Sequence, residues 1–317
     1  TSVGVAIGFN WVEAHTTAGI GAGADVSASG DVSVVADASS KPLEIVVPEL
    51  DGTGIDVTSL VVGASVGNGA DAGAGSAAID IFTPTTRASI GAGALVEADG
   101  SVRVRALDDT EIISFAGALA ASAEAAGIGI GLHVLVLVKD TEAWIAASDD
   151  ALTPTTVTAG GNVTVEADAS EDVFSLTVNA GVTAGDSPGG AGGAIVAVLD
   201  TDTRAFVGID PQLETAPLGN ALVEADGSVH IAADSTTKID AAAGSLGVSL
   251  DDNSFGASVA VVVDIDDTLA FVGEGAAITA FGNGTAIDVR DGNFDGDGNQ
   301  GTEAVNGLAV TATSVED

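Results

Sequence analysis

The chain has 317 residues with neither cysteine nor methionine, and its 46 acidic against 8 basic side chains give a formal charge of −38. That charge repels nucleic acid and anionic lipid, which excludes a nucleic-acid partner, and the lack of cysteine excludes disulfides and thiolate-bound metals. Apolar residues make up 46% of the chain but aromatic residues only 3%. We therefore expect small side chains to fill a narrow interior.

One phrase returns five times along the chain, at intervals of 55 to 70 residues. Its copies start at Ala18, Ala88, Ala143, Ala205 and Ala270. The nine residues ALVEADGSV are identical at 94–102 and 221–229. Such self-similarity is typical of a fold in which each unit buries its apolar face against the next. We predict one all-β solenoid, a parallel β-helix with loop insertions, over residues 1–317.

Each unit opens with a long apolar run of period-two alternation, which indicates a β-strand with one buried face. These runs begin at Val3, Ala74, Gly127, Gly192 and Gly256. A short strand and then two strands joined at a glycine turn follow in each unit. Strands of about five residues would give three coils per repeat, about fifteen coils in all, and a rod of roughly 70 Å.

The same alternation predicts aliphatic side chains inside the solenoid and carboxylates outside it. In the fourth unit we expect an inner set of Val223, Val229 and Ile231. Its outward set would be Glu224, Asp226, Ser228 and His230.

Three insertions distinguish the units and are expected to carry binding surfaces: 149–156, 209–220, and a stretch that starts at Phe281. The segment from Phe115 to Val138 is apolar enough to suggest a transmembrane helix. Glu124, the Gly alternation and the similar runs in other units oppose that reading, so we predict no membrane span. A short alanine-rich helix over residues 118–126 remains open. Both ends of the chain lie inside the repeat pattern without a polar cap, which suggests end-to-end stacking.

The sharpest local signal is DGNFDGDGNQGTE, residues 291–303. Its hard oxygen ligands alternate, and Gly296 stands at the sixth place, as in an EF-hand-type calcium loop. The candidate ligands are Asp291, Asn293, Asp295, Asp297, Asn299 and Glu303. Thr302 occupies the twelfth place, so the closing carboxylate comes one residue late. A calcium site without an EF-hand fold and a solvated acidic turn are both open.

Acidic groups follow the long apolar run in several units: Asp140 and Glu142, Asp200 and Asp202, and Asp264, Asp266 and Asp267. Stacked coils would place them in a column that bound cations could neutralise, with Asp264 and Asp266 as further calcium ligands. The simpler alternative is that exposed aspartates end these strands.

Little in the sequence indicates an enzyme. His15, His133 and His230 lie in unrelated phases of the repeat, so we expect surface or core roles for them. Arg103 and Arg105 lie near Asp108 and Asp109, which suggests an ion-pair face or, alternatively, the groups of a polysaccharide lyase or glycosidase. Arg87 and Arg204 occupy nearly equivalent repeat positions and are expected to bridge coils. Threonine-rich stretches such as 153–158 raise an ice-binding alternative.

The phrase pattern GVAVxVxxxDTxAxIGxGAxVxAxGxVxVxAxS, carried by residues 256–280 and 88–106, resembles the repeats of large bacterial surface exoproteins of the haemagglutinin-like and autotransporter-adhesin-like kind. The resemblance implies a right-handed parallel β-helix that is secreted and acts at the cell surface as a stalk, adhesin or filament subunit.

The expected function is therefore an extracellular, calcium-stabilised structural or adhesive solenoid without enzymatic activity. Its expected partners are further copies of itself, stacked end to end, and cell-surface glycans. The alternatives are a polysaccharide-active enzyme on a β-helix and an ice- or ion-binding module.

Overall fold

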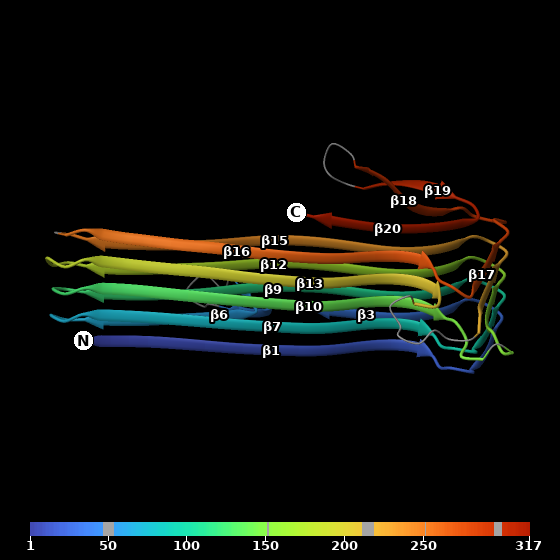
Figure 1. The fold of residues 1–317 in the computed structure, drawn as a ribbon, viewed down its shortest axis with the longest axis horizontal. Helices are drawn as coiled ribbons and strands as arrows, with labels where there is room; N and C mark the ends of the chain where they lie inside the picture. The colour runs from blue at the N-terminus through green and yellow to red at the C-terminus, as the bar shows by residue number, and fades with distance from the viewer. Residues whose placement is uncertain (47–53, 151, 211–218, 251, 295–299) are drawn as a thin grey trace.

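Coils stacked along one axis form the solenoid, and their strands line up into three parallel β-sheets (Figure 1). The computed structural model describes residues 1–46, 54–150, 152–210, 219–250, 252–294 and 300–317. All regular elements among these residues are strands, with no helix. The prediction of an all-β, parallel solenoid is confirmed. The alanine-rich helix considered for residues 118–126 is wrong, because β9 (Val102–Ser122) continues through Ala118.

Two of the sheets are built from long strands that face each other. Sheet A consists, in spatial order, of β1 (Ser2–Ile20), β7 (Ala72–Ile90), β10 (Gly127–Ala146), β13 (Gly189–Gly208) and β16 (Ser254–Val272). Sheet C consists of β20 (Leu308–Glu316), β15 (Val229–Ser249), β12 (Val163–Thr183), β9 and β3 (Val32–Ser40), and β6 (Ser59–Gly67) also pairs with β9.

A short third sheet closes one end of the cross-section. Sheet B consists of β17 (Ala276–Ala280), β14 (Ala221–Ala225), β11 (Thr155–Ala159), β8 (Leu95–Ala98) and β2 (Asp25–Ala28). Two antiparallel hairpins are inserted into the coils. The hairpin of β4 (Leu43–Val46) and β5 (Gly54–Val57) lies between β3 and β6 of sheet C, and that of β18 (Ile287–Phe294) and β19 (Gln300–Val305) lies between β17 of sheet B and β20 of sheet C. In each coil the chain runs along sheet A, crosses sheet B and returns along sheet C. We call the opposite end, where sheet C turns directly into sheet A, the far end.

Each sequence repeat forms one coil, so the expected three coils per repeat and fifteen in all are wrong. The phrase alanines lie in one continuous row of the sheet A ladder: Ala18, Ala88, Ala143, Ala205 and Ala270. The long strands have 19 to 21 residues, which corresponds to roughly 65 Å of extended chain. Five coils rise only about 24 Å at the usual strand spacing, so the described structure is a broad slab and not a rod.

Glycines on the inner faces allow the two long sheets to approach very closely at the far end. A Cβ added to Gly181 of β12 would lie 1.8 Å from the backbone oxygen of Gly190. One added to Gly127 of β10 would lie 2.3 Å from the backbone oxygen of Val182. These separations are far below any van der Waals contact, so the inner positions must lack side chains. The expected narrow interior is confirmed here in its extreme form.

The interior widens toward sheet B and is filled there by larger aliphatic side chains. Ile145, Val165, Val207 and Ile231 are all fully buried in this cluster. A second apolar cluster lies further along the strands around Leu135 and Leu199 and contains Phe82, Ile112 and Val173 as well. At the far end only alanines remain: Ala72, Ala74, Ala118 and Ala120.

The inner set expected for the fourth unit is confirmed, since Val223, Val229 and Ile231 are at most 2% exposed. For two members of the outward set the expected exposure is wrong. Ser228 is fully buried, because it lies at the turn between sheets B and C. Its hydroxyl accepts the backbone N–H of Gly307 in the last coil. His230 is on the outer face of sheet C but is buried beside the β18–β19 hairpin, and its Nε2 lies 3.1 Å from the hydroxyl of Thr311 in the neighbouring coil.

We predict that Gly181→Ala destabilises the protein by about 1–3 kcal/mol, because the new methyl group forces the two sheets apart. Chemical denaturation followed by circular dichroism measures the loss. Gly73→Ala is the matched control: its Cβ would meet nothing within 4 Å, so this variant should be neutral or slightly more stable. Equal effects of the two substitutions would contradict close sheet contact.

Candidate binding pocket and buried charged layers

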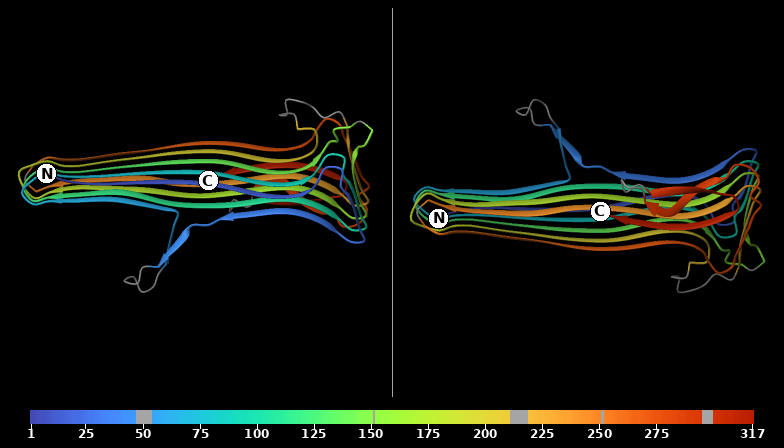
Figure 2. Two further views of the ribbon diagram at one scale, coloured as in Figure 1. Left: turned by 90° about the horizontal axis from the view of Figure 1, so that it is seen from below. Right: turned by 90° about the horizontal axis from the view of Figure 1, so that it is seen from above.

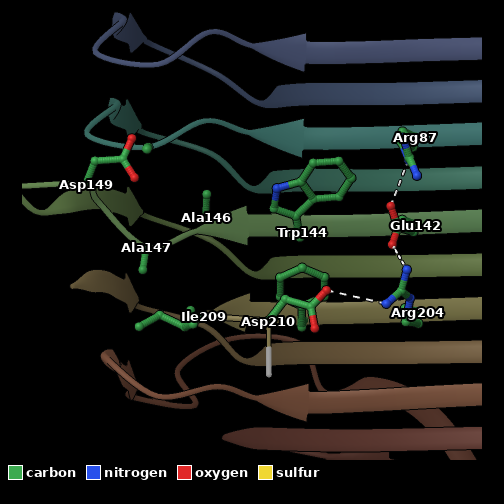
Figure 3. Close-up of a pocket in the computed structure, with 12 residues that line it drawn as sticks. Arg87, Glu142, Trp144, Ala146, Ala147, Asp149, Arg204, Ile209 and Asp210 are labelled. Carbon is green, nitrogen blue, oxygen red and sulfur yellow. Dashed lines mark hydrogen bonds and ion pairs between the residues drawn. The ribbon is translucent and has the colours of Figure 1, made fainter. Parts of the chain in front are cut away.

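A pocket of about 540 Å³ opens on the outer face of sheet A, at its sheet B end (Figure 3). Its floor comes from three successive coils, because Arg87, Glu142 and Arg204 occupy one row of the ladder. Its rim includes Ile209 and Asp210, at the start of the 209–220 insertion. The start of one of the three insertions expected to carry binding surfaces therefore lies at the pocket, and residues 211–218 lie outside the described part of the chain.

Aromatic rings stack on the same outer face of sheet A. Each ring lies two residues further along its strand than the row of Arg87, Glu142 and Arg204. Trp144 and Phe206 have ring centroids 6.0 Å apart with planes 7° from parallel. Phe206 and Phe271 are 5.0 Å apart and 1° from parallel. The row continues to Ser89 in β7, which has no ring. The indole of Trp144 is therefore the last member of the stack, and its face toward Ser89 has no aromatic neighbour.

An ion-pair chain crosses the pocket from coil to coil. The Nε of Arg87 donates to a Glu142 oxygen at 2.8 Å, and its guanidinium also bonds Asp140. Arg204 pairs with the other oxygen of Glu142 and lies 3.4 Å from Asp210. The prediction that Arg87 and Arg204 bridge neighbouring coils is confirmed.

Burial sets the electrostatics of this chain. Desolvation raises the pKa of Glu142, with repulsion from Asp140 adding to it, while the two arginines act in the opposite direction. Desolvation also raises the pKa of Asp202, which shares a row with Asp140 and Asp267. The predicted acidic column thus exists for these three residues. They lie within strands, so the alternative that they end the strands is wrong.

A buried charged layer separates the two larger apolar clusters. The ammonium group of Lys139 is fully buried and lies 2.9 Å from Asp108 and 2.7 Å from Glu171, both of sheet C. It also donates to the backbone oxygens of Asp108 and Ser170 at 3.0 Å. Desolvation raises the pKa of Glu171, and Lys139 partly offsets that shift. One ammonium group is therefore shared by two carboxylates between the sheets.

A second polar layer lies nearer the far end. His133 Nε2 is 2.8 Å from Asp80, and its Nδ1 lies 2.5 Å from the Ser175 hydroxyl. Ser114 donates to the same aspartate at 3.0 Å. This order of serine, histidine and aspartate also occurs in hydrolases, but here all three are at most 1% exposed. The layer links the sheets and presents no group to a substrate.

Two of the histidines are buried and one is exposed. His133 belongs to the interior, while His15 is exposed and contacts Glu13 at 3.1 Å. His230 is buried, and desolvation lowers its pKa. Arg103 and Arg105 form the expected ion-pair face, with Glu166 at 2.9 Å and Asp168 at 2.7 Å.

Asp108 does not belong to that ion-pair face. It points inward and is 1% exposed, whereas Asp109 is on the outer face, because successive residues of a strand point to opposite sides. Treating Asp108 as an exposed partner of Arg103 and Arg105 is therefore wrong.

Two of the candidate calcium ligands, Asp264 and Asp266, lie on the inward face of β16 in the last coil. Asp266 accepts from Thr268 at 2.9 Å and from Ser314. One oxygen of Asp264 has no hydrogen-bond partner among the described residues. Desolvation raises the pKa of Asp264, and repulsion from Glu316 and Asp266 adds to it. These oxygen ligands suit a hard cation, although no group of three metal-binding side chains converges within the described chain.

The other candidate calcium ligands belong to the β18–β19 hairpin. Asp291 accepts the backbone N–H of Asn293 at 2.9 Å, and Glu303 pairs with Val289 across the two strands. Asp295, Asp297 and Asn299 lie outside the described residues. The elements that flank this loop are strands, in agreement with the expected absence of an EF-hand fold.

Sequence reasoning missed the main features of the pocket and of the charged layer. The aromatic row had a readable signal, since Trp144, Phe206 and Phe271 each follow the phrase alanine directly. Lys139 had none: its ladder neighbours are Thr201 and, in the last coil, Asp266, so the charge does not repeat.

We predict that Lys139→Met costs about 3–5 kcal/mol of unfolding free energy at pH 7, because two buried carboxylates lose their counter-charge. Burial raises the pKa of Glu171, so in the folded state this carboxyl takes up a proton more readily as the pH falls toward 4.5, the ordinary pKa of a glutamate. A protonated carboxyl needs no cation. The loss should therefore be smaller at pH 4.5. Guanidinium denaturation at both pH values measures it.

Lys238→Met is the control for this experiment. Lys238 is 48% exposed and pairs with Asp172 on the surface, where solvent screens the pair, so its loss should leave the free energy of unfolding nearly unchanged. A Lys139→Met variant whose loss is the same at both pH values would contradict the assigned role.

Comparison with protein-family models, curated proteins and solved structures found no match to this chain. In the described residues there is also no helix of sufficient length and hydropathy to cross a membrane.

Proposed function

We propose that this chain is an extracellular structural and adhesive solenoid, stabilised by calcium, that serves as a surface stalk or filament subunit. The observation that carries this proposal is the geometry of its end coils. Among the described residues, β1 pairs only with β7 and β16 only with β13, so each outer strand leaves one side of its backbone unpaired over 19 residues. A further parallel coil would satisfy those groups.

Side chains at the last coil support the same proposal. Val262 on the inward face of β16 is 42% exposed, whereas Ala197, its ladder partner in β13, is fully buried. Stacking another coil on β16 would cover this inner surface as each internal coil is covered. The resemblance to bacterial surface exoproteins supports an extracellular setting for such a stack.

Calcium enters the proposal at the same coil. Asp264, Asp266 and Glu316 lie near one another where coil stacking would bring further backbone close. A divalent cation would offset their mutual repulsion, and cations that bind only the folded or stacked form raise its stability by mass action. In the interior of the third coil, Lys139 performs that neutralising role for Asp108 and Glu171.

We expect the chain to form concentration-dependent end-to-end assemblies in millimolar calcium, and chelator to shorten them and lower the melting temperature. Sedimentation velocity and thermal unfolding measure the two effects. Val262→Lys should block stacking, while Leu222→Lys, on the outer face of sheet B, should not. The double variant Asp264→Asn and Asp266→Asn should lose the calcium shift. A melting temperature that changes with neither calcium nor chelator would contradict the role of calcium. Assemblies that Val262→Lys leaves unchanged would contradict end-to-end stacking.

A second candidate function, carbohydrate binding, is favoured by the pocket on sheet A. The free indole face of Trp144 lies beside carboxylate and guanidinium groups, a combination that can stack on the apolar face of a sugar ring and bond its hydroxyls. This pocket is where an adhesin of this architecture would contact a cell-surface glycan.

Because the chain has only two tryptophans, glycan binding can be followed at Trp144 alone. In a Trp11→Phe background we expect neutral oligosaccharides to change the fluorescence of Trp144. Trp144→Ala should abolish retention on a glycan array, while Trp11→Ala, which removes an exposed residue of β1, should keep it. Equal retention by both variants would contradict the pocket, and release of new reducing ends would favour the polysaccharide-active alternative.

A further inference from the structure

The outer face of sheet A is apolar from the far end to the middle of its strands, contrary to the expectation that large aliphatic side chains point inward. Ile7 of β1 is 75% exposed, Ile130 of β10 is 58% exposed and Phe255 of β16 is 57% exposed. A contiguous apolar surface of this kind on a chain with a formal charge of −38 marks an interaction site. We call it the apolar band.

The band is corrugated, with ridges and grooves that alternate from coil to coil. Large side chains form the ridge on β10: Ile128, Ile130 and Leu132. The residues at the same heights on β13 are Gly190, Gly192 and Ala194, which form a groove. The same alternation occurs between β1, with Val3, Val5 and Ile7, and β7, with Gly73, Gly75 and Ala77.

The grooves have room for side chains from another surface. A Cβ added to Gly73 would meet nothing within 4 Å, and one added to Gly192 would meet only ordinary contacts at 3.8 Å and beyond. A hollow of about 400 Å³ lies over β13, between Ile130 and Leu132 on one side and Ala257 on the other. Only at Gly190 does a neighbour, the ring of Phe255, already fill the space.

We propose that a second copy of this chain docks on the apolar band, with the ridge of each copy in the groove of the other. A two-fold axis that runs parallel to the strands, between β10 and β13, achieves this. Rotation about such an axis preserves height along the strands, and Ile130 and Gly192 are ladder partners at the same height. Each copy's β10 ridge then faces the other copy's β13 groove, and the exposed side chains of Phe255 and Val259 on β16 face the β7 groove.

The size of the band agrees with what a stable dimer needs. The proposed axis opposes four strands, β7, β10, β13 and β16, which at about 4.8 Å per strand and over about ten residues of 3.3 Å each give roughly 630 Å² per copy. Specific protein interfaces of standard size bury about 600 to 1,000 Å² on each partner, so this area lies at the lower end of that range. Sheet C offers no comparable flat approach, because the β4–β5 hairpin projects from its side of the slab (Figure 2).

Charge confines the contact to the band and predicts its response to salt. The row of Asp140, Asp202 and Asp267 borders the band toward sheet B, and the proposed axis places like charges of the two copies opposite each other. Added salt screens that repulsion but leaves the apolar contact intact, so the dimer should tighten as ionic strength rises. This pairing uses side-chain faces and leaves the backbone edges of β1 and β16 free for end-to-end stacking.

The test is groove filling, measured by sedimentation equilibrium on the full chain in a Val262→Lys background that prevents stacking. We expect Gly192→Val and Gly73→Val to weaken the dimer at least about tenfold, because valine occupies the space the opposing ridge needs. Gly244→Val, on the outer face of sheet C, is the matched control and should not change the dimer. Circular dichroism melting verifies that all three variants fold.

Ile130→Asp gives a second, independent disruption, since it places a charge on the exposed ridge without altering the backbone. A wild-type chain that stays monomeric at high salt would overturn the proposal. Valine variants that associate more tightly than the wild type would also overturn it, because that result would indicate non-specific hydrophobic association instead of shape complementarity. Flotation of the monomer with neutral phosphatidylcholine vesicles would assign the band to lipid. Loss of long assemblies with Val262→Lys while dimers persist would separate this inference from end-to-end stacking.

Discussion

The close approach of the two long sheets is the constraint on which the rest of the structure depends. At the far end the facing strands come so near that their inner positions carry glycine, alanine and small polar residues such as Ser122 and Thr183, and at Gly127 and Gly181 there is no room even for a methyl group. A residue type that is usually a weakness in a strand is here a requirement. Since the inner positions cannot accept large side chains, the aliphatic residues that alternate with them must point outward. The apolar band on sheet A is therefore the direct counterpart of the thin interior.

The same narrowness explains why the interior contains charge. Carboxylates cannot be buried alone, so each inward aspartate or glutamate has a specific partner: Lys139 for Asp108 and Glu171, and His133 for Asp80. On the outer face Arg87 and Arg204 form ion pairs with Glu142. The chain has 8 basic side chains, and several of them lie at positions where carboxylates of neighbouring coils would otherwise repel each other. The last coil differs, because Asp266 has only hydroxyl partners on the inward face and one oxygen of Asp264 has no hydrogen-bond partner among the described residues.

Much of the architecture could be predicted from the sequence, because the repeat phrase marks positions that stack in register. Alanines at the phrase starts and the arginine bridges followed from that logic. The coil size did not, because strands of about five residues were expected, whereas the apolar run from Gly127 continues into a single strand 20 residues long. The direction of the side chains also could not be read, since a period of two fixes which residues share a face but not which face is buried. The pocket was missed because its parts come from three repeats, whereas motifs were sought within one.

In-register stacking also has an evolutionary consequence. Every coil presents to its neighbour the same row of phrase alanines, with the same path from sheet A through sheet B to sheet C. Duplication or deletion of a whole repeat in the gene would therefore change the height of the slab by one strand spacing and leave its cross-section intact. Selection can adjust the reach of such a molecule by copy number alone, while pockets that span three coils are rebuilt wherever the right order of units recurs.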